Sequence, residues 1–343
     1  MSHSPRRALL ALALVGAIAG CGPASVSPTP TSPPPAGSSS SILSSAPISS
    51  LEATPSVPGA TVAPSRPPSA TPSPSAASAI PAFRHIYVIV MENHEFGTIV
   101  GDQRATYINA LIGRSGLATN YTAVAHPSEP NYLALFGGST FGVHDDGVYD
   151  LAGTNLADQL VAHGRTWHVY AQDVPDGCSR VAFADGPGDL LGAPGAYARK
   201  HEPAISFRDI SGDPTACANI TALAGFDPQA ADFELIVPNQ TNDMHDGTIE
   251  QGDAFLASMV PRITASKDFA GSLLLITWDE GSSAIGGGGR VATIVVSDRT
   301  APGFRSATAH SHYSLLATVQ GAWGLGCLRE SCGANDLREF FGP

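Results

Sequence analysis

Residues 85–91 read HIYVIVM, an apolar run rich in β-branched side chains that is followed at once by Glu92-Asn93-His94. A short run without polar alternation is typical of a strand buried on both faces, as in a sheet covered by helices on both sides. Residues 273–278 (LLLITW) and 291–296 (VATIVV) have the same character. We therefore expect these three segments to be buried strands.

Segments of helical character alternate with further strands along the chain. The expected strands are 117–124, 167–171 and 233–237, and the expected helices are 106–114, 155–163, 248–263 (with Pro261 as a kink or end) and 313–323. This alternation indicates an α/β fold with a mostly parallel central sheet and helices on both faces. Ligands of such sheets bind beyond the carboxyl ends of the strands.

Polar clusters follow four of the expected strands. They are Glu92-Asn93-His94, His126-Pro127-Ser128, residues 238–246 (PNQTNDMHD) and Asp279-Glu280-Gly281. Each has an ordinary alternative, namely a helix cap, a turn or a core histidine. Because four clusters occur at the same kind of position, a shared site explains them better.

The segment HPSEPN, residues 126–131, places a hydroxyl and an amide three residues apart where a strand meets a helix. Helix N-termini favour anions. Ser128 is therefore placed to attack a phosphorus atom, and Asn131 to donate to a phosphoryl oxygen. The alternative is a serine that caps an ordinary buried helix.

The residue types at these strand ends suit hydrolysis of a phosphate ester. Carboxylate and amide oxygens are hard ligands for a divalent cation, which would lower the pKa of Ser128 and neutralise phosphoryl oxygens. A histidine would protonate the leaving group and then activate the water that cleaves a phosphoserine. Histidines that are protonated below about pH 6.5 would also bind phosphate, which predicts an acidic optimum.

The first 82 residues read as an export signal and a spacer. Arg6 and Arg7 precede an apolar run in a signal at 1–20, and Ile18-Ala19-Gly20-Cys21 resembles the lipobox of bacterial lipoproteins. Residues 21–82 are rich in Pro, Ser, Ala and Thr, which predicts a disordered tether. We expect a lipid at Cys21 to anchor the protein outside the membrane. The alternative is ordinary cleavage near Ala19, and release by cutting of the tether stays open.

Residues 83–343 are long enough for one acidic domain. The whole chain has 18 basic and 30 acidic residues; leaving out three arginines and one glutamate before residue 83 gives 15 and 29, a net charge of −14. Non-specific nucleic-acid binding needs a basic face, so we do not expect it.

Four cysteines remain besides Cys21. An even number in an exported protein predicts two disulfides, and we favour 327–332 and 178–217. No pair has the spacing of a thiolate zinc site.

Five segments resemble the bacterial phosphoesterase family, which includes secreted acid phosphatases and phospholipases C. They are residues 89–101 (IVMENHEFGTIVG), 120–147 (NYTAVAHPSEPNYLALFGGSTFGVHDDG), 238–256 (PNQTNDMHDGTIEQGDAFL), 273–281 (LLLITWDEG) and 310–326 (HSHYSLLATVQGAWGLG). The likeness is strongest to the acid phosphatase branch, which includes a secreted mycobacterial phosphatase acting on phosphatidylinositol 3-phosphate. It implies an alkaline-phosphatase-like fold and a metal-dependent serine nucleophile.

The resemblance also implies roles for individual residues. Ser128 is the nucleophile and His245 a catalytic acid or base, while Asn131, His126 and His312 bind substrate. The implied metal ligands are Glu92, Asn93, Ser128, Asp279 and Glu280. This oxygen-rich set suits one hard ion, although one metal or two stays open.

We therefore expect a metal-dependent acid phosphatase that hydrolyses phosphomonoesters, phosphoinositides included, through a phosphoserine. One alternative is a phosphodiesterase of the phospholipase C type. Another is a non-catalytic surface lipoprotein that binds a ligand.

Overall fold

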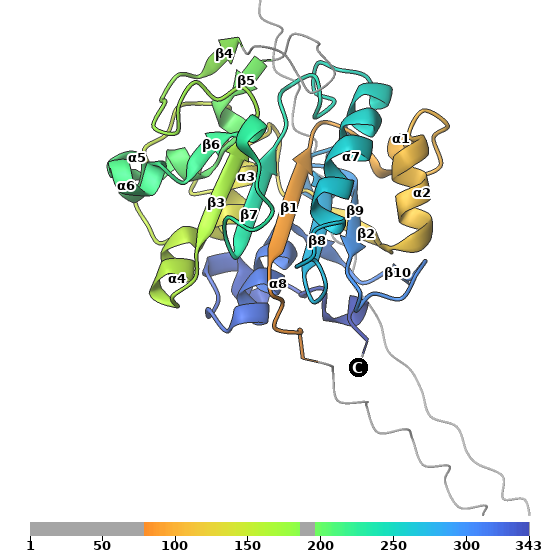
Figure 1. Cartoon of the computed structure of the whole chain (residues 1–343). Helices are drawn as coiled ribbons and strands as arrows, with labels where there is room; N and C mark the ends of the chain where they lie inside the picture. The colour runs from red at the N-terminus through yellow and green to blue at the C-terminus, as the bar shows by residue number, and fades with distance from the viewer. Residues whose placement is uncertain (1–78, 186–195, 343) are drawn as a thin grey trace, which may run out of the picture. The chain divides into compact units, whose positions relative to one another are not determined.

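The central feature of the structure is a nine-stranded mixed sheet (Figure 1). The structure, a computed structural model, describes residues 79–185 and 196–342. The predicted signal and all of the predicted tether before residue 79 lie outside this part of the chain. The strands are β1 (Ile86–Met91), β2 (Gly116–Thr122), β3 (Trp167–Ala171), β4 (Phe183–Asp185), β5 (Ala196–Ala198), β6 (Ile220–Ala222), β7 (Phe233–Val237), β8 (Leu273–Trp278), β9 (Arg290–Val296), β10 (Arg305–Ser306) and β11 (His310–Ser311).

The strand order of this sheet is β10-β2-β9-β8-β1-β7-β3-β6, with β11 also paired to β2, while β4 and β5 pair with each other in a separate two-stranded sheet. All pairs in this sheet are parallel except those of β9, which runs antiparallel to both β2 and β8. The connection from β8 to β9 contains no α-helix, and parallel neighbours need a longer crossover. The predicted mostly parallel α/β fold is confirmed, and β9 is its antiparallel exception.

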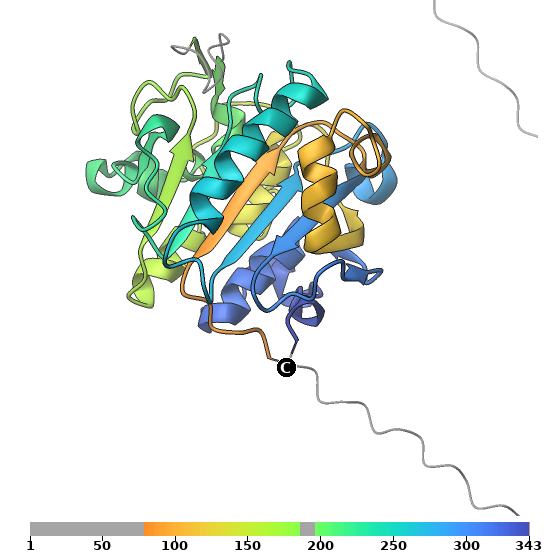
Figure 2. The same cartoon turned by 45° about the vertical axis from the view of Figure 1, so that its right-hand side comes forward.

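Helices cover both faces of the sheet. They are α1 (Phe96–Ile99), α2 (Thr106–Arg114), α3 (Glu129–Gly137), α4 (Leu156–Ala162), α5 (Arg208–Ser211), α6 (Pro214–Cys217), α7 (Ile249–Thr264) and α8 (His312–Trp323). Figures 1 and 2 show α2 and α7 side by side in front of the sheet, and α3 and α8 behind it. Every residue of β1 and β8 is consequently buried. No helix in the described part of the chain is both long and apolar enough to cross a membrane.

Local sequence explains where the long helices begin. Thr248 caps α7 by accepting from the amide of Gln251, and Asn155 caps α4 by accepting from that of Asp158. The sequence left two alternatives for Pro261, a kink or the end of its helix. The helix does not end there, because α7 continues to Thr264. Strand β2 ends at Thr122, two residues before the predicted end, and a loop then leads to α3.

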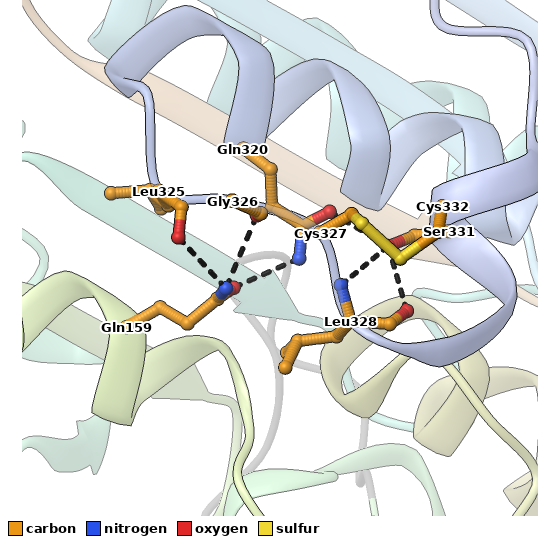
Figure 3. Close-up of a disulfide and its surroundings, with 8 residues drawn as sticks. All are labelled: Gln159, Gln320, Leu325, Gly326, Cys327, Leu328, Ser331 and Cys332. Atoms are coloured by element: carbon orange, nitrogen blue, oxygen red, sulfur yellow. Dashed lines mark hydrogen bonds between the residues drawn. A yellow bond between two sulfur atoms is a disulfide. The ribbon is translucent and has the colours of Figure 1, made fainter.

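Both predicted disulfides, Cys178–Cys217 and Cys327–Cys332, are present. Figure 3 shows the second, next to hydrogen bonds that join Gln159, Gln320 and Ser331. The short loop between its cysteines covers the carboxyl end of α3, because Arg329 Nη1 donates to the carbonyl of Gly137 at 2.6 Å. The disulfide loop thus supports the helix that begins beside Ser128.

Candidate active site

The four predicted polar clusters meet at the carboxyl edge of the sheet, at the upper end of β1 in Figure 1. Main-chain contacts join them: the amide of Glu92 donates to the carbonyl of Asp243 at 2.8 Å, and that of Asn93 donates to Asp279 Oδ1 at 3.0 Å. Asn93 holds a left-handed backbone conformation with φ 57°. The strand ends therefore bring the predicted residues into one cluster.

Ser128 lies in the middle of this cluster and is 1 % exposed. Its hydroxyl lies 3.2 Å from Glu92 Oε2 and 3.5 Å from Glu280 Oε1. Its backbone is helical, and its side chain makes no capping hydrogen bond to α3. The serine is thus directed at the acidic residues rather than at the helix that follows it.

Besides Glu280, three buried carboxyl groups lie in this cluster: Glu92, Asp243 and Asp279. Burial raises the pKa of each, and the charge of Asp279 adds to the rise at Glu92 and Asp243. Tyr132 donates its hydroxyl to Glu92 Oε1. Neither Oδ2 of Asp243 nor Oδ2 of Asp279 accepts a hydrogen bond, although His201 Nδ1 lies 3.3 Å from Asp243 Oδ2.

The buried Oδ2 atoms of Asp243 and Asp279 fit a divalent cation. Buried carboxylates are stable only when they are paired, hydrogen-bonded or bound to metal, and oxygen-rich sets favour hard ions. Glu92, His201 and His245 also offer ligand atoms within 4.8 Å of one another. The residues of the cluster therefore fit the implied metal ion.

His201 completes the buried side of the cluster. Its Nε2 lies 3.4 Å from Glu92 Oε2 and its Nδ1 lies 3.3 Å from Asp243 Oδ2. Its ring stacks on that of Tyr132, with centroids 5.4 Å apart. Burial lowers the pKa of His201 well below its ordinary value, so a neutral imidazole faces the acids.

His245 lies next to His201 at the more open side of the cluster, with ring centroids 5.6 Å apart. Its Nδ1 lies 2.8 Å from Asp246 Oδ1, and its Nε2 lies 3.2 Å from Lys200 Nζ. Lys200 also donates to Asp146 Oδ2 at 2.9 Å.

His126 flanks the serine from the loop that precedes α3. Its Nε2 donates to the carbonyl of Ser283 at 2.8 Å, and its Nδ1 lies 2.6 Å from Glu280 Oε2. Burial lowers the pKa of His126, but the Ser283 carbonyl and the Glu280 charge outweigh it and raise the pKa. Burial and the charge of Asp279 raise the pKa of Glu280 to about 7.

Asn131 and His312 lie against the backbone of the site. The oxygen of the Asn131 amide accepts from the N–H groups of Val124 and Ala125 at 2.9 and 3.1 Å, and its nitrogen donates to the carbonyls of Ala125 and Pro127. The amide therefore holds the loop that carries Ser128.

His312 donates from Nε2 to the carbonyl of Asp279 at 2.5 Å, and its Nδ1 accepts from the Tyr121 hydroxyl at 3.1 Å. Burial lowers its pKa to about 4. Both ring nitrogens of His312 thus contact protein groups, the Asp279 carbonyl and the Tyr121 hydroxyl. Its substrate-binding role stays a prediction.

Four residues of the site, His201, Asp243, Lys200 and Asp146, were not predicted as site residues from the sequence. Asp243 precedes His245 by two residues within the polar segment 238–246, so the signal for it was present. His201 and Lys200 lie in a short 3₁₀ turn at Arg199–His201. Strand β5 ends directly before that turn, but three residues are too short for a pattern that the sequence alone would show.

Comparisons of the sequence with known proteins show its family. Residues 102–326 match the model of the Phosphoesterase family. The chain is 35 % identical to a phosphatidylinositol-3-phosphatase of Mycobacterium tuberculosis over 73 % of this chain and 80 % of that protein. It is 32 % identical to a phosphate-repressible acid phosphatase of Penicillium chrysogenum over 75 % of this chain and 63 % of that protein. The match thus spans less than two thirds of this fungal relative.

The chain also resembles solved structures at low sequence identity. One is a protein in complex with its substrate D-glucosamine-2-N,6-O-disulfate, with TM-score 0.50, 8 % identity and coverage of 76 % of this chain and 80 % of that chain. Another is a protein in the alkaline phosphatase superfamily from Vibrio parahaemolyticus, with TM-score 0.47, 9 % identity and coverage of 75 % and 72 %. The first of these likenesses concerns the fold alone.

Proposed function

The chain belongs to the Phosphoesterase family, and on that premise we propose that it is an acid phosphatase that hydrolyses phosphomonoesters through a phosphoserine at Ser128. The observation that carries this proposal is the buried Ser128 hydroxyl between Glu92 and Glu280. A serine in ordinary solvent is a weak nucleophile, so it needs a neighbouring group that removes or stabilises its charge.

A divalent cation is the proposed activating group. Glu92, Asp243 and Asp279 are its main ligands in this proposal, with Asn93, Ser128 and Glu280 from the predicted set around them. Such an ion supplies positive charge that lowers the pKa of a serine hydroxyl and stabilises phosphoryl oxygens. The buried Oδ2 atoms of Asp243 and Asp279, which accept no hydrogen bond, support this assignment.

The reaction proceeds in two displacements at phosphorus. Ser128 passes its hydroxyl proton to Glu280 and its Oγ forms a bond to phosphorus, while the bond to the leaving oxygen breaks and His245 donates a proton to that oxygen. In the second step His245 takes a proton from water, whose oxygen displaces Ser128 Oγ and releases inorganic phosphate, and Glu280 returns the proton to the serine. Acidic pH keeps His126 protonated, and its predicted contact with the phosphoryl group requires one ring N–H group to leave Ser283 or Glu280.

Assay of the full-length protein tests this function. We expect hydrolysis of p-nitrophenyl phosphate that a chelator abolishes, and a loss of at least about a thousandfold in Ser128→Ala. Ser139→Ala, just past the far end of α3, is the matched control and should retain activity. Wild-type turnover by Ser128→Ala would show that the nucleophile is assigned wrongly.

The substrate profile separates the proposal from its alternatives. Faster hydrolysis of bis(p-nitrophenyl) phosphate or phosphatidylcholine than of monoesters would favour a phosphodiesterase, and no turnover at all would favour a ligand-binding lipoprotein. The name of the mycobacterial relative makes phosphatidylinositol 3-phosphate the first physiological candidate. A rate that rises steadily toward pH 9 would contradict the acidic optimum.

The proposed location is the outer side of the cell membrane. Export through residues 1–20 and lipid attachment at Cys21 would place the catalytic domain on the tether of residues 21–82. Metabolic labelling with palmitate should mark the wild-type protein and not Cys21→Ser. Equal labelling of both would overturn the anchor.

A further inference from the structure

We propose that Lys200 binds the second negative charge of a phosphomonoester and so gives the site its preference for monoesters over diesters. This inference rests on the proposed function and assigns a specificity role within the same site. It starts from the position of the ammonium group.

Lys200 is one of only two lysines in the chain, and it is 9 % exposed. Holding a lysine this deeply costs free energy unless its charge has partners. The other lysine, Lys267, has a side chain that is 79 % exposed and lies 3.9 Å from Asp268. The chain thus places one ammonium in the site and one in solvent.

Two contacts hold the ammonium group of Lys200 between His245 and the first turn of α3. On one side Nζ lies 3.2 Å from Nε2 of His245, the proposed acid and base. On the other side Nζ donates to Asp146 Oδ2, whose Oδ1 accepts from the main-chain amide of Glu129 at 3.1 Å. Glu129 directly follows Ser128, so Asp146 ties the lysine to the first turn of α3.

The charge balance of the site makes this position matter. Glu92, Asp243, Asp279 and Glu280 are all buried around Ser128 and would repel an anionic substrate. Above its second pKa of about 6 a monoester carries close to two negative charges, whereas a diester carries one, so the two esters are compared at pH 7. The three N–H donors of a lysine outnumber the two contacts described for Nζ, which leaves a donor for a phosphoryl oxygen. Lys200 therefore stabilises the bound monoester, with its second negative charge, more than it stabilises the bound diester.

The test compares Lys200→Met with wild type, with Lys200→Arg as the variant that keeps the charge and Lys267→Met as the matched control. We expect Lys200→Met to lower kcat/KM for p-nitrophenyl phosphate about ten- to a hundredfold and that for bis(p-nitrophenyl) phosphate less than about threefold. Lys200→Arg should keep most of the preference, and Lys267→Met should match wild type on both substrates.

A second readout uses inorganic phosphate as the probe. Its inhibition constant, measured against the diester, should rise about tenfold or more in Lys200→Met and stay unchanged in Lys267→Met. If Lys200→Met does not fold, Lys200→Gln serves the same comparison. Equal loss toward both esters, or an unchanged monoester preference, would overturn the role of Lys200 while leaving the phosphatase intact. Wild-type protein that hydrolyses no monoester would overturn both proposals.

Discussion

A serine before a helix most often caps that helix with its side chain. Ser128 does not cap α3, and its hydroxyl contacts acidic residues. Its side chain makes no bond to α3 and lies instead among Glu92 and Glu280. The sequence predicted this convergence, because each acid directly follows a recognisable strand. It did not predict His201 or Lys200, since these lie in an irregular segment whose position depends on tertiary packing.

Asn131 gives a prediction that separates support from substrate binding. Asn131→Ala removes four main-chain contacts and leaves the N–H groups of Val124 and Ala125 unpaired. We expect a loss of about 3 kcal/mol of unfolding free energy and a lower kcat. The exposed Asn120→Ala is the control for denaturant unfolding. A raised KM at unchanged stability would instead indicate that the amide binds phosphate.

Glu234 gives a prediction for the pH dependence of stability. Burial raises its pKa from 4.5 to about 8. The folded state therefore holds a proton that the unfolded state has lost, and this contribution to stability declines as pH rises from about 4.5 through 8. Glu234→Gln cannot ionise and should remove a decline of up to about 4 kcal/mol. The unfolding free energy is measured at pH 5 and pH 8.5 in wild type and in Glu234→Gln. An equal fall between the two pH values in the two proteins would contradict this prediction.

At the level of elements, the long apolar runs were predictable and the short pieces were not. Strands β3, β7 and β8 and helix α2 have the predicted bounds. Strands β6, β10 and β11 are two or three residues long, too short for a pattern, and they form because neighbouring strands offer hydrogen-bonding groups. The direction of β9 depends on the connection before it, which an apolar run does not encode.

Two glycines, Gly138 at the end of α3 and Gly113 inside α2, test opposite effects of an added Cβ on stability. Gly138 has φ 72°, and a Cβ there would clash with the carbonyl oxygen of Leu328 in the disulfide loop. Gly138→Ala should therefore cost more than about 1 kcal/mol. Gly113, inside α2, would place a Cβ with no neighbouring atom within 4 Å, so Gly113→Ala should stabilise by about 0.5–1 kcal/mol. Thermal midpoints that shift in the same direction would refute this account.

On the scale of the whole molecule, the fold gathers buried acids at one edge of an acidic domain. The pKa values of Glu92, Asp243 and Asp279 are raised mainly by burial. Without a bound cation, stability must therefore decline as pH rises and these groups lose their protons. A divalent cation favours the ionised carboxylates and offsets that decline.

Removal of metal should reveal this coupling. We expect a chelator to lower the thermal midpoint by about 5 °C at pH 8 and by less at pH 5. Readdition of Mg²⁺, Ca²⁺, Mn²⁺ or Zn²⁺, tested separately, should restore it in wild type and not in Asp279→Asn. A shift that is larger at pH 5, or equal in the variant, would speak against a carboxylate metal site.

The most direct test of the central claim is to trap the covalent intermediate. The full-length protein is mixed with p-nitrophenyl phosphate, quenched in acid and digested, and the peptides are analysed by mass spectrometry. We predict one phosphoryl group on the peptide that contains Ser128, located at that serine and absent from Ser128→Ala. A phosphoryl group on another residue of the wild-type protein, with full turnover in Ser128→Ala, would contradict the account.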